Sequence, residues 1–317
     1  MLRRTRWSAG LLAIFIAGLV FGGGWACTHL AQPARLRVTV SVVEGLRGST
    51  DEGYARATEP RSFSVPADHG PHPDYRTEWW YYTGNLETPD GRHFGFQLTF
   101  FRIALAPQLL PRQSAWATNQ LYMAHLAVTD VAGGRFHAFE RFSRGALDLA
   151  GAQAQPFRVW LEDWTAEAVG ESPLPVRLRA AEDDVAIDLT LDSAMPPVLQ
   201  GNKGLSQKGH EPGNASYYYS FTRMSAAGTV RIGDRHFAVQ GLAWMDREWS
   251  TSALGPAQTG WDWFAVQLSN GQDLMFYRLR RQDGSTDPFS AGTLVRNDGS
   301  TRRLGRADVV LEPVGHW

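Results

Sequence analysis

From residue 62 onward, the chain consists of short segments in which apolar and polar residues alternate, or apolar residues run together, over the length of one strand. Such runs are HFGFQLTFFRIAL (93–105), YMAHLAVTD (122–130), DVAIDLTLDS (184–193), SYYYSFTR (216–223), HFAVQGLAWM (236–245) and WDWFAVQLS (261–269). Turn signals separate them at 89–91, 133–134, 270–271 and 298–299. No segment sustains a long helical period. The pattern predicts an all-β fold, either an antiparallel barrel or a sandwich.

The turn Pro89-Asp90-Gly91 allows a register to be predicted for the first hairpin. With a three-residue loop, the pairs on one face are Leu86–Phe94, Gly84–Phe96, Tyr82–Leu98, Trp80–Phe100 and Glu78–Arg102. That face is apolar up to its last pair, whereas the opposite face is more polar. Glu78 therefore points into an aromatic interior, where Arg102 would keep it ionised. A structural ion pair is favoured over a catalytic acid.

The turn Asn270-Gly271 predicts a second hairpin, because Asn-Gly favours a two-residue loop. Pairing outward from it gives Leu268–Asp273, Val266–Met275, Phe264–Tyr277 and Asp262–Leu279 on one face, and Gln267–Leu274, Ala265–Phe276, Trp263–Arg278 and Trp261–Arg280 on the other. Stacking of the two Trp rings on the Arg side chains is expected. Asp262 ends an otherwise apolar face. It is either held protonated by burial or simply accepts hydrogen bonds from backbone or Trp N–H groups.

A third stretch, GLAWMDREWST, carries two carboxylates in one strand. Trp244, Asp246, Glu248 and Ser250 would share one face, and Met245, Arg247 and Trp249 the other. Because the two carboxylates repel each other, one proton can be held near neutral pH, which is what a general acid needs. The alternative is a solvated strand end whose charge Arg247 neutralises.

Other candidate motifs carry less information. His125 lies inside an apolar run, and a core histidine is favoured over one that faces a cavity. His69 and His72 have a metal-like spacing but no evident third ligand, so no metal is expected. The sequence lacks a G-x-S-x-G elbow, a P-loop and an H-E-x-x-H motif. The Gly- and Lys-containing segment 201–209 is too loose for a phosphate cradle, and no cofactor is expected.

Composition changes this picture in two ways. A net charge of −1 over 317 residues gives no reason to expect nucleic acid or an anionic membrane surface as partner. The 12 Trp, 16 Phe and 9 Tyr residues favour sheets and sites for apolar or ring-shaped ligands.

The N-terminus predicts export. Three arginines precede an apolar run from Ala9 to Phe21, which is typical of a signal peptide, with an uncleaved membrane anchor as the alternative. Cys27 stands where a lipoprotein cysteine would stand, although Gly24 and Trp25 fit a lipobox poorly. We therefore expect residues 1–27 to be a signal peptide or anchor, residues 28–60 a linker, and the rest to lie in a bacterial periplasm or to face it from the membrane. A single cysteine allows no intrachain disulfide.

Six stretches together resemble one known family: HPDYRTEWWYYTGNL, FGFQLTFFR, AHLAVTD, YYYSFTR, GLAWMDREWS and GWDWFAVQLSNGQDLMFYRLR. This is the lipocalin-like family that includes carotenoid 1,2-hydratase (hydroxyneurosporene synthase) and the AttH-like exported proteins. The resemblance runs from about Tyr54 to Trp317. It implies tandem lipocalin-like β-barrels with an apolar cavity, residues 61–250 forming the first and residues 251–317 the second. The family continues past the position that Trp317 matches, so the second barrel is expected to be incomplete.

The resemblance implies two functions. The hydratase branch adds water to an isoprenoid double bond without a cofactor, and its acid lies in a motif that MDREW matches at Asp246 and Trp249. The AttH-like branch resembles proteins that accompany an ABC-type export system, which implies a lipid carrier or accessory protein with a transporter permease as partner. The word hydrolase, often applied to that branch, finds no supporting nucleophile here.

The sequence therefore predicts an exported protein that binds a hydrophobic isoprenoid or lipid ligand. In the first hypothesis it hydrates or isomerises an alkene, and in the second it carries the ligand without chemistry. The residues expected to be catalytic are Asp246, Glu248 and Asp262. Those expected to line the ligand site are Glu78, Trp80, Tyr82, Arg102, His125, Trp244, Trp249, Trp261 and Trp263.

Overall fold

The computed structural model describes residues 51–108, 111, 113–252, 254–255 and 257–315. All of them belong to one compact unit, Ser41–Trp317. The predicted leader, Cys27 and most of the predicted linker lie outside the described residues. Within the described part, no helix is both long enough and apolar enough to span a membrane.

The regular secondary structure of the described chain is almost entirely β, as predicted. The strands are β1 (Thr77–Glu87), β2 (His93–Ala104), β3 (Gln120–Asp130), β4 (Arg135–Arg144), β5 (Ala150–Ala154), β6 (Phe157–Leu161), β7 (Trp164–Ala168), β8 (Val176–Glu182), β9 (Val185–Asp192), β10 (Val198–Leu199), β11 (Leu205–Gln207), β12 (Ala215–Ile232), β13 (Arg235–Ser250), β14 (Gln258–Gln267), β15 (Asp273–Arg281), β16 (Ala291–Val295) and β17 (Thr301–Gly305). Two short 3₁₀ turns, η1 (Ala67–His69) and η2 (Arg306–Asp308), complete the described elements.

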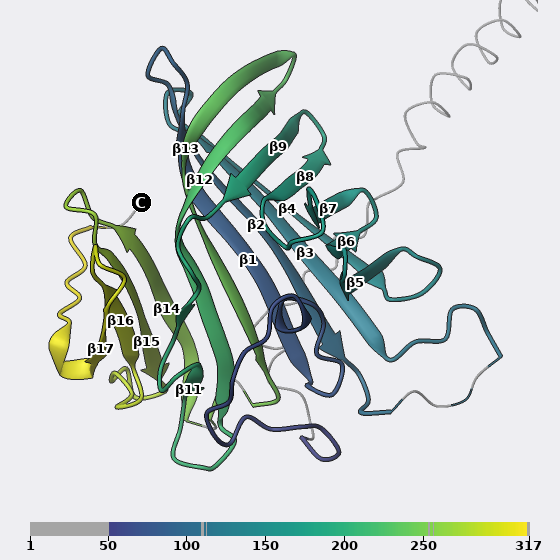
Figure 1. The fold of residues 1–317 in the computed structure, drawn as a ribbon, viewed down its shortest axis with the longest axis vertical. Helices are drawn as coiled ribbons and strands as arrows, with labels where there is room; N and C mark the ends of the chain where they lie inside the picture. Colours follow the sequence, from purple (N-terminus) through teal and green to yellow (C-terminus); the bar gives the residue numbers. More distant parts are fainter. Residues whose placement is uncertain (1–50, 109–110, 112, 253, 256, 316–317) are drawn as a thin grey trace, which may run out of the picture. The chain divides into compact units, whose positions relative to one another are not determined.

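The first thirteen strands form one antiparallel sheet that curls into a nearly closed barrel (Figure 1). Its order is β4-β3-β2-β1-β13-β12-β9-β8-β7-β6-β5, with the short strands β10 and β11 added to β12. Strands β4 and β5 end this order, and no ladder joins them. Arg141 on β4 reaches across to the Glu182 carboxylate (Nη2 to Oε2, 2.6 Å) and to the Ala181 carbonyl (3.1 Å), so side chains tie β4 to β8.

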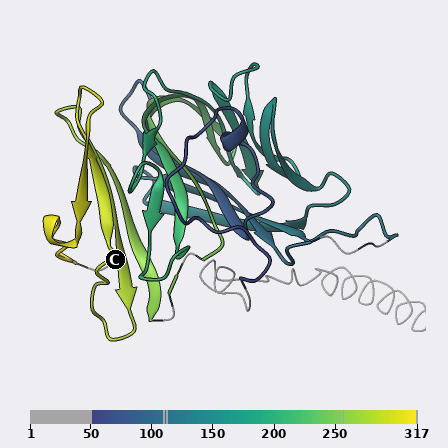
Figure 2. The same ribbon diagram turned by 60° about the horizontal axis from the view of Figure 1, so that its bottom comes forward.

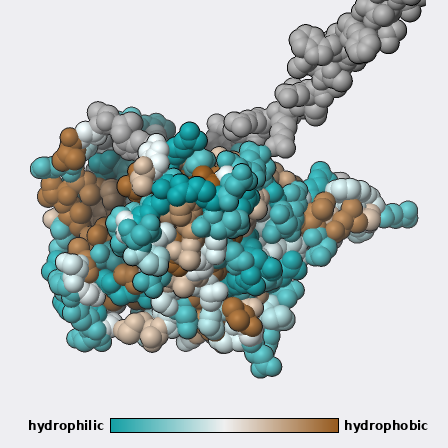
Figure 3. Space-filling model, turned by 90° about the horizontal axis from the view of Figure 1, so that it is seen from above, coloured by the Kyte–Doolittle hydropathy of each residue, from teal (hydrophilic) through white to brown (hydrophobic). Residues whose placement is uncertain are grey.

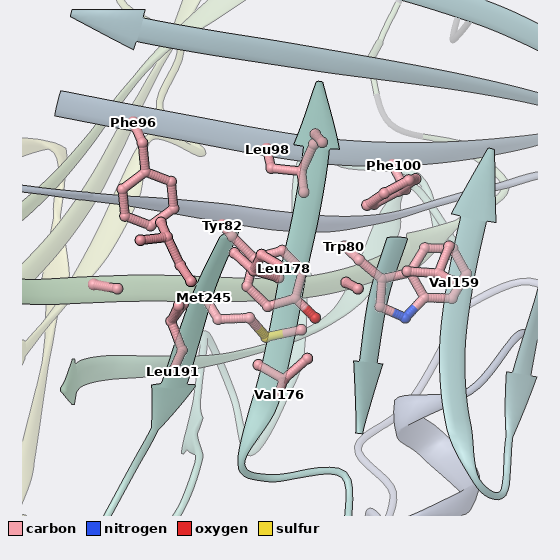
Figure 4. Packing of buried hydrophobic residues seen from close by; sticks show 14 of the residues in the cluster. Trp80, Tyr82, Phe96, Leu98, Phe100, Val159, Val176, Leu178, Leu191 and Met245 are labelled. Carbon is pink, nitrogen blue, oxygen red and sulfur yellow. The ribbon is translucent and has the colours of Figure 1, made fainter. Parts of the chain in front are cut away.

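The barrel interior is packed with side chains. On β1, Glu78, Trp80, Tyr82 and Leu86 point inward with at most 1% of their surface exposed. Aromatic and aliphatic residues of the other strands fill the space between them (Figure 4). This is the alternation that the sequence pattern predicts: one face of each strand makes the core and the other faces outward.

The first hairpin has the predicted register. Leu86 pairs with Phe94, Trp80 with Phe100, and Glu78 with Arg102. Thr88 N–H donates to the Arg92 carbonyl (3.0 Å) around a three-residue loop, in which Gly91 takes a φ of 83°. A left-handed residue at this position is what a three-residue hairpin loop requires, and glycine adopts it without strain.

The second hairpin, β14–β15, was predicted one residue out of register. Trp263 pairs with Tyr277, Trp261 with Leu279, and Asp262 with Arg278. The loop again has three residues, since Leu268 N–H donates to the Gln272 carbonyl (2.8 Å) and Gly271 has a φ of 84°. The Asn-Gly rule for two-residue loops failed here because the glycine serves the same three-residue geometry as Gly91. The predicted stacking of Trp261 and Trp263 on the opposite arginines therefore gives way to pairing with Leu279 and Tyr277.

Strands β14 to β17 form a second, smaller antiparallel sheet in chain order. This open sheet stands beside the barrel rather than closing into a second one (Figures 1 and 2). A β-bulge between Phe221 and Met224 turns Thr222 and Arg223 of the barrel toward it. Both side chains bind the Asp273 carboxylate, at 2.8 and 2.6 Å. The bulge thus docks the second sheet on the outer face of the barrel.

Seen from above, most of the surface is hydrophilic, and hydrophobic residues form separate patches (Figure 3).

Candidate functional site

A cavity of about 320 Å³ lies between the outer face of β1, β12 and β13 and the inner face of β14 and β15. Its lining is mainly aromatic: Trp79, Tyr81, Phe101, Tyr218, Trp261, Trp263, Tyr277 and Leu279. Three ionisable side chains also line it, Asp246, Glu248 and Lys208. An apolar cavity with a few polar groups at defined positions is typical of a small-molecule site, and this one is at the small end of the usual range of about 300–1,000 Å³.

Strand alternation on β13 aims Asp246 at this cavity. Met245, Arg247 and Trp249 point into the barrel, so Trp244, Asp246 and Glu248 face the second sheet, as predicted for a strand. The β1–β13 register sets Asp246 beside Tyr81 and Glu248 beside Trp79.

Asp246 is a buried carboxyl that keeps its proton near neutral pH. Burial raises its pKa to about 7; hydrogen bonds from Ser220, Trp244 and Tyr218 lower it, and the Glu248 charge raises it. Ser220 Oγ and Trp244 Nε1 donate to Asp246 Oδ1 at 2.6 and 2.8 Å. The predicted alternative, a solvated strand end, is wrong because only 3% of Asp246 is exposed.

Glu248 has a charged partner on the same side of the sheet. Lys208 Nζ lies 3.3 Å from Glu248 Oε1, and the Ser216 hydroxyl donates to the same oxygen. Lys208 also lies over the Tyr277 ring, 3.8 Å from its centre. Burial lowers the pKa of Lys208, but Glu248 and Tyr277 outweigh it and the pKa is raised. One end of the cavity therefore carries a neutral acid and the other an ion pair.

Tyr218 lies against the acid. Trp263 Nε1 donates to its hydroxyl oxygen at 3.2 Å, which leaves the phenolic proton for another acceptor. Burial and then the charges of Asp246 and Glu248 raise the pKa of Tyr218 well above its usual value, so the phenol stays protonated. Burial and Asp246 likewise raise the pKa of Tyr81 to about 12.

The predicted site residues fall into two groups on opposite sides of the barrel wall. Trp244, Asp246, Glu248, Trp261 and Trp263 belong to the side of the cavity. Glu78, Trp80, Tyr82, Arg102 and Trp249 point into the packed barrel interior. Their expected role in lining the same ligand site is wrong, because the period of two along a strand sends alternate residues to opposite faces.

Glu78 is the centre of a buried ion-pair network. Arg102 and Arg247 both bind its carboxylate, and His72 N–H donates to both of its oxygens at 3.1 Å. Burial raises the pKa of Glu78, but the two arginines and His72 outweigh it and lower it overall. His72 also stacks on Trp249, with ring centres 3.8 Å apart. The predicted structural role of Glu78 agrees with this geometry, and the second partner, Arg247, was missed.

Asp262 and His125 lie outside the cavity lining. Asp262 pairs with Arg278 (Oδ2 to Nη2, 2.5 Å) and Arg280 (3.6 Å), and 27% of its side chain is exposed. The expectation of a protonated Asp262 or one bound to Trp N–H groups is replaced by this ion pair. His125 binds Glu140 (2.9 Å) on the outer face of the barrel and is a quarter exposed, so it is not a core histidine.

Sequence reasoning missed Lys208, Tyr218 and Tyr277. Lys208 lies in the segment dismissed as a loose loop, and only the β11–β12 ladder brings it to the cavity. The signal that could have found Tyr218 is the run SYYYSF, whose alternation places it opposite to Tyr217 and Tyr219. Among the described residues, no group of three or more His, Cys, Asp and Glu could hold a metal ion.

The sequence profile of the AttH-like proteins matches residues 56–317. The chain belongs to the AttH-like family. The structure is similar to that of an AttH protein from Nitrosomonas europaea, with a TM-score of 0.75 and 34% sequence identity, over 83% of this chain and 78% of that one.

A second solved structure shares the fold. Kievitone hydratase from Nectria haematococca matches with a TM-score of 0.57 and 14% identity, over 80% of this chain and 72% of that one. At that identity the likeness concerns the fold alone. No curated protein matches the sequence.

Proposed function

We propose that this protein binds an apolar alkene, of the isoprenoid or unsaturated lipid class, and adds water across its double bond by acid catalysis. The observation that carries the proposal is Asp246: a buried carboxyl that faces an aromatic cavity and whose pKa burial raises to about 7. Protonating an alkene needs an acid, a surface that stabilises a cation, and a water molecule.

The acid is available at neutral pH because burial raises the pKa of Asp246 to about 7. The Ser220 and Trp244 hydrogen bonds, at 2.6 and 2.8 Å, fix the orientation of the carboxyl group. The aromatic faces of Tyr81, Tyr218 and Trp263 surround the place where a carbocation would form, and ring faces attract positive charge.

The Asp246 proton moves to one alkene carbon, and the π electron pair forms the new C–H bond. Water oxygen bonds to the resulting tertiary cation, and its extra proton passes to Glu248. Glu248 lies two residues from Asp246 on one face of β13, roughly 7 Å away along the strand. Proton return through solvent restores both carboxyl groups.

The test is turnover in ¹⁸O-labelled water. The full-length protein is incubated with linear isoprenoids of ten, fifteen and twenty carbons and with an acyclic carotenoid, and the extracts are analysed by mass spectrometry. We expect a product heavier by one labelled water. The Asp246→Asn variant should lose at least a hundredfold of kcat while retaining substrate binding, because the amide keeps the shape but cannot supply the proton.

Glu140→Gln, on the outer face of the barrel at His125, is the matched control and should leave the rate unchanged. A substrate recovered unchanged but bound would contradict the enzyme proposal and indicate the carrier function instead. Equal rates for Asp246→Asn and the unmodified protein would assign the acid to another residue.

A further inference from the structure

A second hollow, of about 410 Å³, adjoins the cavity along the same two strands. We call it the outer groove: it is lined from the barrel by Thr83, Asn85, Gln97 and Thr129, and from the second sheet by Phe264 and Gln267. It shares Tyr81 and Trp263 with the cavity. Their rings meet edge to face with centres 5.1 Å apart, so this pair forms the boundary between the two spaces.

The β1 register measures how far the outer groove extends from the acid. Tyr81 pairs with Asp246, and Asn85 lies four residues farther along the same outward face. Four strand residues span roughly 14 Å. A molecule whose double bond lies at Asp246 and whose other end lies in the outer groove therefore needs a chain of roughly this length that runs past the Tyr81–Trp263 pair.

The chemistry of the outer groove differs from that of the cavity. None of the described residues that line it is charged, and its polar groups are carboxamides and hydroxyls. Asn85 and Thr129 are exposed and have no side-chain hydrogen bond to any other described residue. Gly95 lies on its floor, where an added Cβ would meet the Thr129 side chain at 3.5 Å. Phe136 and Phe264, exposed by 59% and 36%, add ring faces.

We propose that the outer groove binds a neutral, hydroxyl-rich headgroup, a sugar, joined to the apolar chain that enters the cavity. Carboxamides and hydroxyls both donate and accept hydrogen bonds, as sugar hydroxyls require, and aromatic faces suit the C–H face of a pyranose. A phosphate or carboxylate would find no cation among the lining residues to compensate its desolvation. The substrate class is then an alkenyl glycoside. This inference deepens the proposed function, and only the reaction at the alkene end of the substrate rests on that function.

The test measures binding with saturated ligands, so it does not depend on hydration. Titration calorimetry on the full-length protein compares n-octyl β-glucoside, n-octyl phosphate and n-octyltrimethylammonium, each below its micellar concentration. The three share a chain and differ in headgroup charge. We expect the glucoside to bind at least tenfold more tightly than either charged ligand.

Variants locate the site. Asn85→Val with Thr129→Val should weaken glucoside binding about tenfold and leave 1-octanol binding within twofold. Thr190→Val, an exposed threonine on β9 of the same barrel, is the matched control and should change nothing. No glucoside binding, equal binding of all three headgroups, tighter binding of a charged one, or an unaffected double variant would each overturn the proposal. Glucoside binding by an unmodified protein that hydrates none of the alkenes would overturn only the catalytic role of Asp246 and leave the headgroup site standing.

Discussion

Asp246 is a single residue whose environment decides its chemistry. Its carboxyl group lies among rings, receives hydrogen bonds from Ser220 and Trp244, and has Glu248 as its charged neighbour on β13. Glu248 differs, because the Lys208 ammonium group and the Ser216 hydroxyl bind its carboxylate. Two carboxylates two residues apart are thus separated into an acid that keeps its proton and a paired anion, the arrangement that acid–base catalysis uses.

The raised pKa of Asp246 predicts that the free energy of unfolding depends on pH. The folded-state pKa of Asp246, about 7, exceeds its ordinary value of 3.8, so the folded protein holds the proton more tightly than the unfolded chain. The contribution of the protonated Asp246 carboxyl to the free energy of unfolding is fully present below about pH 4 and is lost as the pH rises to 7. The loss is on the order of 4 kcal/mol in the free energy of unfolding.

Urea unfolding between pH 4 and 8 checks this prediction. The unmodified protein should lose stability over that range relative to Asp246→Asn, whose amide does not titrate. Parallel curves for the two proteins would mean that Asp246 is ionised in the fold at neutral pH.

At the scale of elements, the two hairpins β1–β2 and β14–β15 use the same turn. Each has a three-residue loop that ends in a glycine of positive φ, Gly91 at 83° and Gly271 at 84°. In the second hairpin this one residue of loop length decides which side chain opposes Asp262, and hence its ion pair with Arg278.

Replacing either glycine by alanine should destabilise the protein by about 1 kcal/mol, because a Cβ is strained at positive φ. Gly271→Ala should cost more than Gly91→Ala, since its Cβ would meet the Asn297 side chain at 3.2 Å, against 3.7 Å to Glu87 for Gly91. Gly170→Ala is the control: its φ is not in the left-handed region and its Cβ would meet open space. Thermal unfolding measures all three, and a neutral Gly271→Ala would contradict the assigned turn.

At the scale of the whole molecule, the site exists only because the second sheet docks on the barrel. Asp273 at the start of β15 binds Thr222 and Arg223 of the bulge, and Gln267 Nε2 donates to the Thr222 and Ala243 carbonyls at 2.7 and 3.0 Å. Gln258 Nε2 donates to the Lys208 carbonyl at 2.7 Å. These contacts hold the two walls of the cavity together.

Asp273→Ala should therefore loosen the second sheet before the barrel unfolds. It leaves Arg223 and Thr222 without their shared acceptor, at a cost of about 2 kcal/mol. Acrylamide quenching of Trp fluorescence should increase and binding of the apolar ligand should weaken, while the barrel keeps its far-UV circular dichroism. Asp188→Ala removes an exposed ion pair with Arg177 and should change none of these. Unchanged quenching in Asp273→Ala would show that other contacts suffice for docking.

The sequence alone determined the all-β class, the longer strands, the first hairpin register and the family. Local alternation and turn chemistry extend over a few residues, so they can be read directly, and they correctly placed Glu78 against Arg102 and Asp246 outward from Met245 and Arg247. The predicted register of the second hairpin, β14–β15, was wrong because Asn-Gly fits both a two-residue and a three-residue loop.

Only the tertiary structure decided which aromatic residues share a space. Alternation shows that Trp249 and Asp246 face opposite ways, but not which face becomes the packed core and which becomes the cavity. That depends on the barrel closing around Trp80 and Trp249 and on the second sheet covering Asp246. Lys208 reaches Glu248 from 40 residues away through the β11–β12 ladder, and the pKa of Asp246 follows from its burial; both are products of packing between distant segments.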